Sequence, residues 1–414
     1  MQIRRDYSQP FFGARRRRRG TGRLLFAYGL FMGGLLVFVS TQFDRLQMTA
    51  LAMVGMAPSP TPFASTLAAQ GYERYLAGDL EEAAALFEQA HRQQPDNVDY
   101  IYEYGRLLIE LDRAEEALPL GDRAIELAPR DPRGYALKAK ALVWMGESDE
   151  AVVVGLAGLD IDPNYAPLHA ALARAYIDVG RYQLALDHGA AGVESDPMNV
   201  DARRSYAVAL IWVGQREEAI LQLEEALALH PNLVNTYFEL AAQYRGLELY
   251  LEAIATYERI RTLDPRNPRA LLRLCETYSQ IGQDGQAEGY CEDALELNPN
   301  YPEAYRALGM VNYRRRNYEG AIDNFEKCVA NGSDEVECWY LRGLAHYYLG
   351  DCDEAWQILQ EALPMAQQLP GGENVVASIT EGLRLTTVSC PAYAGRAVPT
   401  LIPPTPIPPT PIGG

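Results

Sequence analysis

Six cysteines and five histidines are the residues of this 414-residue chain from which zinc and haem-attachment sites could be built. The cysteines form no C-x-x-C pair and the histidines show no H-x-x-x-H spacing, so the common zinc and haem-attachment motifs are absent. The histidines also stand at unrelated positions along the chain: His91, His169, His188, His230 and His346. The sequence therefore predicts no metal site and no cofactor.

Paired carboxylates are the other candidates for chemistry, because two carboxyl groups can act as general acid and general base. Such pairs recur in several segments, at Glu81-Glu82, Glu115-Glu116, Glu217-Glu218 and Glu224-Glu225. Recurrence of this kind is typical of a solvated helix face and not of one catalytic centre. We therefore expect no enzymatic activity.

Charge is distributed unevenly along the chain. The formal net charge is -18, although residues 1–23 hold eight arginines and only one acid. The rest of the chain is therefore even more acidic than the total indicates, and its field repels phosphate backbones. This excludes nucleic acid as an expected partner.

A 34-residue period organises the elements that would position any functional side chain. Prolines follow it at Pro95, Pro129, Pro163, Pro197, Pro231, Pro265 and Pro299. Alanines follow it without exception at Ala83, Ala117, Ala151, Ala185, Ala219, Ala253, Ala287, Ala321 and Ala355. Glycines form a third column at Gly78, Gly146, Gly180, Gly214, Gly282 and Gly350. Because glycine ends helices and proline follows them, the period predicts helix, turn, helix and stop, with alanine where two helices approach closely.

At these columns the sequence resembles the tetratricopeptide repeat (TPR) family. The family pattern is matched best in the last repeat, at Trp339, Gly343, Gly350, Ala355 and Ala362. The resemblance covers nine repeats over residues 64–369 and implies an all-α, right-handed α-solenoid. In such a solenoid the first helix of each repeat lines a concave groove and the second helix forms the convex back. We expect residues 370–390 to supply a C-terminal capping helix.

The family's inward-facing positions place basic and aromatic residues in the groove. Three consecutive repeats contribute the basic residues Arg106, Lys140 and Arg174 to one column. The other expected groove residues are Tyr102, Trp144, Arg204, Trp212, Phe238, Arg273, Arg306, Tyr313, Tyr340 and Tyr347. Aromatic and arginine side chains dominate binding energy at interfaces, so we expect a protein or peptide partner here, with an anionic segment as one candidate. The alternative is that these side chains only pack between repeats or cover helix surfaces.

Repeats two to four depart from the family pattern in their second helices. Gly121, Gly155 and Gly189 stand where the pattern has a large side chain. Glycine weakens a helix interior by roughly 1 kcal/mol relative to alanine. These positions predict either a deformable segment or unusually close helix packing.

All six cysteines lie in the C-terminal third of the chain. Cys275 and Cys291 stand eight residues on either side of Gln283, so they should face each other in an antiparallel helix pair. Cys328 and Cys338 flank a second turn in the same way, which leaves Cys352 and Cys390 to join the last repeat to the cap. Three disulfides are one interpretation, and buried free thiols in small-residue columns are the other.

A membrane anchor is expected before the repeats. Residues 24–43 carry no charge and are long enough to cross a bilayer as a helix. The arginine run in residues 1–23 predicts that this tail is cytoplasmic and that the repeats lie outside the cytoplasm. Alternatives are a buried soluble helix and a signal peptide cleaved near Ala50-Leu51-Ala52. We interpret residues 44–63 as an interfacial segment and a proline-containing linker.

The C-terminal residues 391–414 are rich in proline and threonine, which predicts polyproline II or disorder. Together these features predict a membrane-anchored protein–protein interaction scaffold that binds a partner segment in its groove. The alternative from a different class is a structural or self-assembling spacer of the cell envelope.

Overall fold

The computed structural model describes residue 32 and residues 62–398, and within these residues all regular structure is helical. The first helices of the nine repeats are α3 (Ala64–Ala77), α5 (Val98–Glu110), α7 (Pro132–Trp144), α9 (Ala166–Asp178), α11 (Val200–Trp212), α13 (Val234–Gly246), α15 (Pro268–Gln280), α17 (Pro302–Arg314) and α19 (Val336–Leu349). The second helices are α4 (Leu80–Gln93), α6 (Ala114–Leu127), α8 (Ser148–Leu159), α10 (Tyr182–Ser195), α12 (Arg216–Leu229), α14 (Tyr250–Leu263), α16 (Asp284–Leu297), α18 (Tyr318–Ala330) and α20 (Cys352–Gln368). The helix α21 (Glu373–Ser389) and the short 3-10 helix η1 (Pro391–Tyr393) follow.

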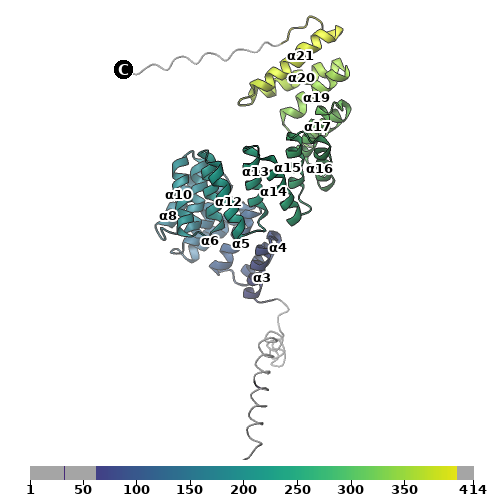
Figure 1. The fold of residues 1–414 in the computed structure, drawn as a ribbon. Helices are drawn as coiled ribbons and strands as arrows, with labels where there is room; N and C mark the ends of the chain where they lie inside the picture. The colour runs from purple at the N-terminus through teal and green to yellow at the C-terminus, as the bar shows by residue number, and fades with distance from the viewer. Residues whose placement is uncertain (1–31, 33–61, 399–414) are drawn as a thin grey trace, which may run out of the picture. The chain divides into compact units, whose positions relative to one another are not determined.

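Each helix packs against its neighbours in sequence, which gives the expected all-helical solenoid (Figure 1). The alanine column provides the contact within each repeat. All nine of its alanines, from Ala83 to Ala355, are 0% exposed. A larger side chain there would hold the two helices apart. Each repeat therefore needs alanine at this position, and the sequence shows it as a 34-residue period.

In every repeat, one residue of the turn between the two helices has the left-handed backbone conformation, with a positive φ. The six glycines of the glycine column have φ between 73° and 89°. In the three repeats that lack this glycine, Asp112, Glu248 and Arg316 adopt φ of 58°, 60° and 62°. The packing of the helix pair therefore imposes the same turn even where the residue type disfavours it.

The glycines inside the second helices serve close packing. A Cβ atom on Gly121 would lie 2.9 Å from the backbone of Lys138 on α7, and one on Gly189 would lie 2.9 Å from Cα of Tyr206 on α11. These distances are too short for a side chain, so the structure supports close approach as the reason for the glycines.

The cysteines are joined in the three pairs that their spacing suggested. Cys275–Cys291 links α15 to α16, Cys328–Cys338 links α18 to α19, and Cys352–Cys390 ties α20 to the end of α21. No free cysteine remains among the described residues. All three bridges lie in the last three repeats and the cap.

The first residues of the C-terminal tail differ from the expectation. Instead of being disordered or extended, residues 391–393 form η1 and Tyr393 is buried, with its ring 5.0 Å from that of Trp356. Its hydroxyl donates to Asp353 Oδ1 at 2.7 Å. The bridge at Cys390 holds this segment against α20, which the proline content did not reveal.

The compact unit that contains the repeats begins at Ala64. Within the described residues, no helix has the length and apolar character needed to cross a membrane. The expected basic tail 1–23, the expected span 24–43 apart from Met32, residues 44–61 of the linker and residues 399–414 lie outside the described part of the chain.

The beginning of the array contacts the middle of the array. The ring of Tyr75 on α3 lies 4.5 Å from that of His230, which follows α12. Asn232 Nδ2 donates to the backbone oxygen of Leu76 at 2.9 Å, across 156 residues of sequence. The first helices from α3 to α13 therefore enclose a common interior, and this closure decides what their inward-facing side chains meet.

Candidate functional site

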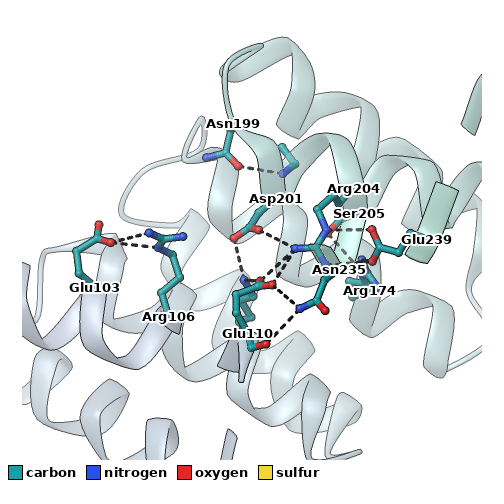
Figure 2. A network of polar contacts seen from close by, with 12 residues as sticks. Glu103, Arg106, Glu110, Arg174, Asn199, Asp201, Arg204, Ser205, Asn235 and Glu239 are labelled. Atoms are coloured by element: carbon teal, nitrogen blue, oxygen red, sulfur yellow. Dashed lines mark hydrogen bonds and ion pairs between the residues drawn. The ribbon is translucent and has the colours of Figure 1, made fainter. Parts of the chain in front are cut away.

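Inside this closed turn, Glu110 is the centre of a buried polar network (Figure 2). It is the last residue of α5 and is 8% exposed. Its carboxylate accepts hydrogen bonds from Lys140 Nζ at 3.0 Å and from Arg204 Nη1 at 3.1 Å. Asn235 Nδ2 donates to the backbone oxygen of Glu110 at 3.2 Å. Four first helices, α5, α7, α11 and α13, thus meet at this one residue.

The remaining members extend the network to either side of Glu110. Arg204 also binds Glu239 at 2.9 Å, and Arg174 binds Glu239 at 3.1 Å. Lys140 also binds Asp201 at 2.8 Å. We call these six residues, Glu110, Lys140, Arg174, Asp201, Arg204 and Glu239, the proximal network. It holds three cations and three carboxylates, so its charge is balanced.

Electrostatics keeps the proximal network ionised. Burial alone would raise the pKa of Glu110, but Arg204 and Lys140 outweigh it and hold that pKa well below its usual range. The pKa of Glu239 is lowered in the same way, with Arg204 and Arg174 overcoming the effect of burial. The cavity between these groups is only about 20 Å³, which is room for about one water molecule.

The positive charge of the predicted basic column, Arg106, Lys140 and Arg174, is therefore neutralised by carboxylates of the same chain. Lys140 and Arg174 belong to the proximal network, and Arg106 binds Glu103 at 2.7 Å and lies 4.3 Å from the centre of the Tyr75 ring. The carboxylates that bind Lys140 and Arg174 come from helices 30 to 65 residues away in sequence. These basic residues present no uncompensated positive charge to a partner.

Two other expected groove residues prove to be interior ones. Arg204 is 5% exposed and is held by Glu110 and Glu239. Phe238 is 7% exposed and packs on Tyr257, with ring centres 6.1 Å apart. Placing both in the accessible groove was incorrect, because the closure of the solenoid and the packing of repeat six cover them.

The other aromatic residues of the first six repeats occupy varied positions. Tyr102 lines a cleft of about 520 Å³ between α3 and α11, together with Tyr72 and Met198. Trp144 lies beneath the cationic groups of Lys140 and Arg174, at 5.7 and 5.4 Å from its ring centre. Trp212 is 56% exposed and stacks on Tyr182 at 5.4 Å.

A second charged group lies further along the array, around Glu276. Glu276 on α15 contacts Arg273 at 2.7 Å, Arg245 of α13 at 3.1 Å and Arg306 of α17 at 3.7 Å. We call Arg245, Arg273 and Arg306 the distal arginine cluster. Among the described residues, the buried Nε atoms of Arg245 and Arg306 have no hydrogen-bond partner. Three guanidinium groups here contact Glu276, and Glu335 is a further carboxylate close to Arg306.

Tyrosines follow the distal arginine cluster along the first helices. Tyr313 packs edge-on against Tyr318 and Tyr348, with ring centres 5.6 and 6.1 Å away. Tyr340 packs against the core of the last repeat and cap, and the Tyr347 hydroxyl lies 3.2 Å from Ser389 Oγ. The side chains of repeats seven to nine thus combine arginine with tyrosine.

Sequence reasoning missed several residues of the site. It did not single out Glu110, Asp201, Glu239 or Asn235, because their roles depend on distant partners. It also treated the histidines as scattered, whereas His169 and His188 meet with ring nitrogens 3.0 Å apart. Across residues 62–398 no group of three or more histidine, cysteine or acidic side chains is arranged to hold a metal ion.

Comparison with known proteins gives family matches over parts of the chain. The model of the tetratricopeptide repeat family matches residues 74–141 and 247–311. A model described as anaphase-promoting complex, cyclosome, subunit 3 matches residues 280–362. These regions fall inside the helix pairs described above.

Individual relatives are distant and partial. The TPR repeat-containing protein YpiA of Bacillus subtilis is 27% identical over 145 residues, which is 35% of this chain and 34% of that protein. Hsp70-Hsp90 organizing protein 2 of Arabidopsis thaliana is 22% identical over 30% of this chain and 22% of its own length. The chain therefore spans about a third or less of these curated relatives.

A solved structure supports the fold alone. A chain of the APC/C hetero-tetramer Cut9-Hcn1 superposes with a TM-score of 0.55 and 18% identity, covering 73% of this chain and 59% of that one. At this identity the similarity concerns the arrangement of helices and carries no activity with it.

Proposed function

Because the chain is built of tetratricopeptide repeats, we propose that it is a protein-interaction scaffold that binds a segment of a partner protein along its inward-facing first helices. The observation that carries this proposal is the row of arginine and tyrosine side chains on α15, α17 and α19. Arg273 and Arg306 keep 38% and 24% of their side-chain surface exposed. Partly exposed arginine beside tyrosine is the composition of binding hot spots.

We place this scaffold at a membrane, with the repeats outside the cytoplasm. The uncharged residues 24–43 and the arginines before them support an anchor with a cytoplasmic N-terminus. The three disulfides support an oxidising compartment, because such bridges persist outside the cytosol. A reporter that is active only outside the cytoplasm, fused after Gly414, should be active. Activity of a cytoplasm-only reporter there would overturn this location.

Site-specific photo-cross-linking tests the scaffold proposal. A photoreactive amino acid at Tyr347, on the first helix α19, should cross-link a partner protein in native membranes. The matched control is Leu251, which is 72% exposed on the second helix α14. Cross-links to a partner from position 251 but none from position 347 would contradict the proposal. Cross-links from position 347 only to a second copy of the chain would favour the self-assembling spacer.

A further inference from the structure

We propose that His230 makes the closed turn of the solenoid sensitive to pH, so that the turn is closed at neutral pH and opens in mild acid. The contact concerned joins the end of α3 to the loop that follows α12. Its residues are Tyr75, Leu76, Gly78, His230 and Asn232, and we call them the clasp. This device belongs to the fold and does not depend on the proposed scaffold function.

The first argument is that the clasp is small and not covalent. The rings of Tyr75 and His230 lie 4.5 Å apart, and Asn232 donates one hydrogen bond to the backbone oxygen of Leu76. A Cβ atom on Gly78 would lie 2.5 Å from the backbone oxygen of Asn232, so the turn after α3 packs directly on the loop. All three disulfides lie elsewhere, in the last three repeats and the cap. The clasp can therefore separate without breaking a bond of the chain.

The second argument is the environment of the His230 ring. This residue is 3% exposed, and neither of its ring nitrogens has a hydrogen-bond partner among the described residues. Burial of a polar group without hydrogen bonds is unfavourable, and burial of a charged group is more so. In an open form, water would reach both nitrogens. The closed form thus accepts the neutral ring but disfavours the imidazolium ion.

The charged and titratable groups around His230 come from three helices and one loop. They are Tyr72 and Tyr75 on α3, Glu103, Arg106 and Glu110 on α5, Asp201 on α11 and Asp196 before it. Burial lowers the pKa of His230 and Arg106 adds to this effect, whereas Glu110 and the backbone oxygens of Tyr75 and His230 oppose it. The net result is a lowered pKa in the closed form.

The sign of the pH dependence follows from this difference. An open form with a hydrated ring has a pKa near the ordinary value for histidine, about 6.5. Because the open form takes up the proton more readily, closure is strongest above that pH and weakens as the pH falls below it. The carboxylates of the proximal network stay ionised in this range, since their pKa values are lowered. Mild acid therefore acts on the clasp and leaves the proximal network in place.

Opening of the clasp would widen the cleft of about 520 Å³ beside it. Tyr72 and Leu76 of α3 line one side of this cleft, and Leu229 and Met198 line another. Tyr72, Leu76 and Met198 are already 52%, 44% and 70% exposed. Movement of α3 and α4 away from the loop would add the buried ring of His230 to this surface.

The test measures single-molecule energy transfer in the full-length protein in detergent. Dyes are attached through unnatural amino acids at the exposed positions Ala85 on α4 and Leu221 on α12, which leaves the disulfides intact. Between pH 7.5 and pH 5.0 we expect the ratio of open to closed molecules to rise about threefold or more. A threefold rise corresponds to a pKa difference of about half a unit between the two forms.

A substitution of the histidine itself tests whether His230 is the titrating group. His230→Phe keeps an aromatic ring against Tyr75 but cannot take up a proton, so the response to pH should disappear. The matched control is His346→Phe, which removes a histidine on α19 and should retain the full response.

A second variant opens the clasp without any titration. Gly78→Ala places a methyl group against the backbone of Asn232 and should raise the ratio of open to closed molecules at pH 7.5 about tenfold. Gly146→Ala is the matched control, because Gly146 has the same left-handed backbone conformation but no atom within 4 Å of the new Cβ. It should behave like the wild type. This pair shows that the dyes report on the clasp even if His230→Phe fails to fold.

Four outcomes would overturn the inference. They are an unchanged ratio in the wild-type protein between pH 7.5 and pH 5.0, a full response to pH in His230→Phe, equal ratios in Gly78→Ala and Gly146→Ala, and opening that begins only below about pH 4. The last outcome would assign the opening to carboxylates, because these protonate in that range.

Discussion

In the proximal network three inward-facing cations meet three carboxylates, whereas around Glu276 three arginines contact one carboxylate. The two regions also differ in how they are held together. The proximal repeats close on themselves through Tyr75, His230 and Asn232, while the distal repeats carry three covalent bridges.

This difference shows how one repeat can serve two purposes. Where the solenoid closes, distant first helices supply counter-charges and the interior becomes a rigid, buried core. In the distal repeats three arginines gather at Glu276, and disulfides add covalent links between neighbouring helices. Under the proposed function, stability and recognition lie in different parts of one array.

Reduction of the disulfides should produce the largest difference in stability between the two regions. We expect each lost bridge to lower the free energy of unfolding of the distal repeats by about 2–4 kcal/mol, because the unfolded chain gains freedom. Hydrogen exchange measured by mass spectrometry, before and after reduction, should show loss of protection in α16 to α21. The proximal repeats contain no cysteine and are the internal control. Equal loss of protection in both regions would contradict the separation.

Removal of the central carboxylate should damage the proximal repeats. Glu110→Ala leaves Arg204 and Lys140 buried without their shared partner, and we expect a loss of about 3–5 kcal/mol in the free energy of unfolding. Urea denaturation checks this. Glu116→Ala, which removes an exposed carboxylate paired with Arg113, should leave the midpoint unchanged. A midpoint of Glu110→Ala equal to that control would show that the proximal network does not stabilise the fold.

Acid should weaken the proximal repeats through the same carboxylates. The folded-state pKa values of Glu110, Asp201 and Glu239 are lowered: burial opposes this, but the neighbouring cations prevail. Their stabilisation is thus complete above the unfolded pKa values and is lost as the pH falls below about 4. Hydrogen exchange in α5 to α13 should accelerate there, and less so in Glu110→Ala. Constant protection down to about pH 2 would rule this out.

The smallest expected effect concerns the turn beside the junction of the two regions. Glu248 has a φ of 60° between α13 and α14, so Glu248→Gly should stabilise the protein by about 0.5–1 kcal/mol. The converse control is Gly146→Ala, where φ is 81° and no atom lies within 4 Å of the new Cβ. It should destabilise by about 1 kcal/mol through backbone strain alone. Thermal melting measures both, and a destabilised Glu248→Gly would refute the strain argument.

Much of the fold could be predicted from the sequence, because a repeat depends on contacts within one 34-residue unit and with its neighbours. The alanine column, the proline stops and the partner of Cys275 all follow from such local geometry. The left-handed turns at Asp112, Glu248 and Arg316 could not be read from residue type, since only the packing of the helix pair requires them.

The tertiary structure decides which carboxylate each inward-facing basic residue meets. The sequence by itself determined that basic residues occupy inward-facing positions, among them Lys140, Arg174 and Arg273. Only the closure of the solenoid decided that Lys140 meets Asp201, 61 residues away. Arg273 instead meets Glu276 on its own helix, where packing of the neighbouring first helices brings two other arginines to the same carboxylate. The physical reason is that the repeat pattern fixes the direction of each side chain, whereas its counter-charge comes from whichever helix the curvature of the array brings across the groove.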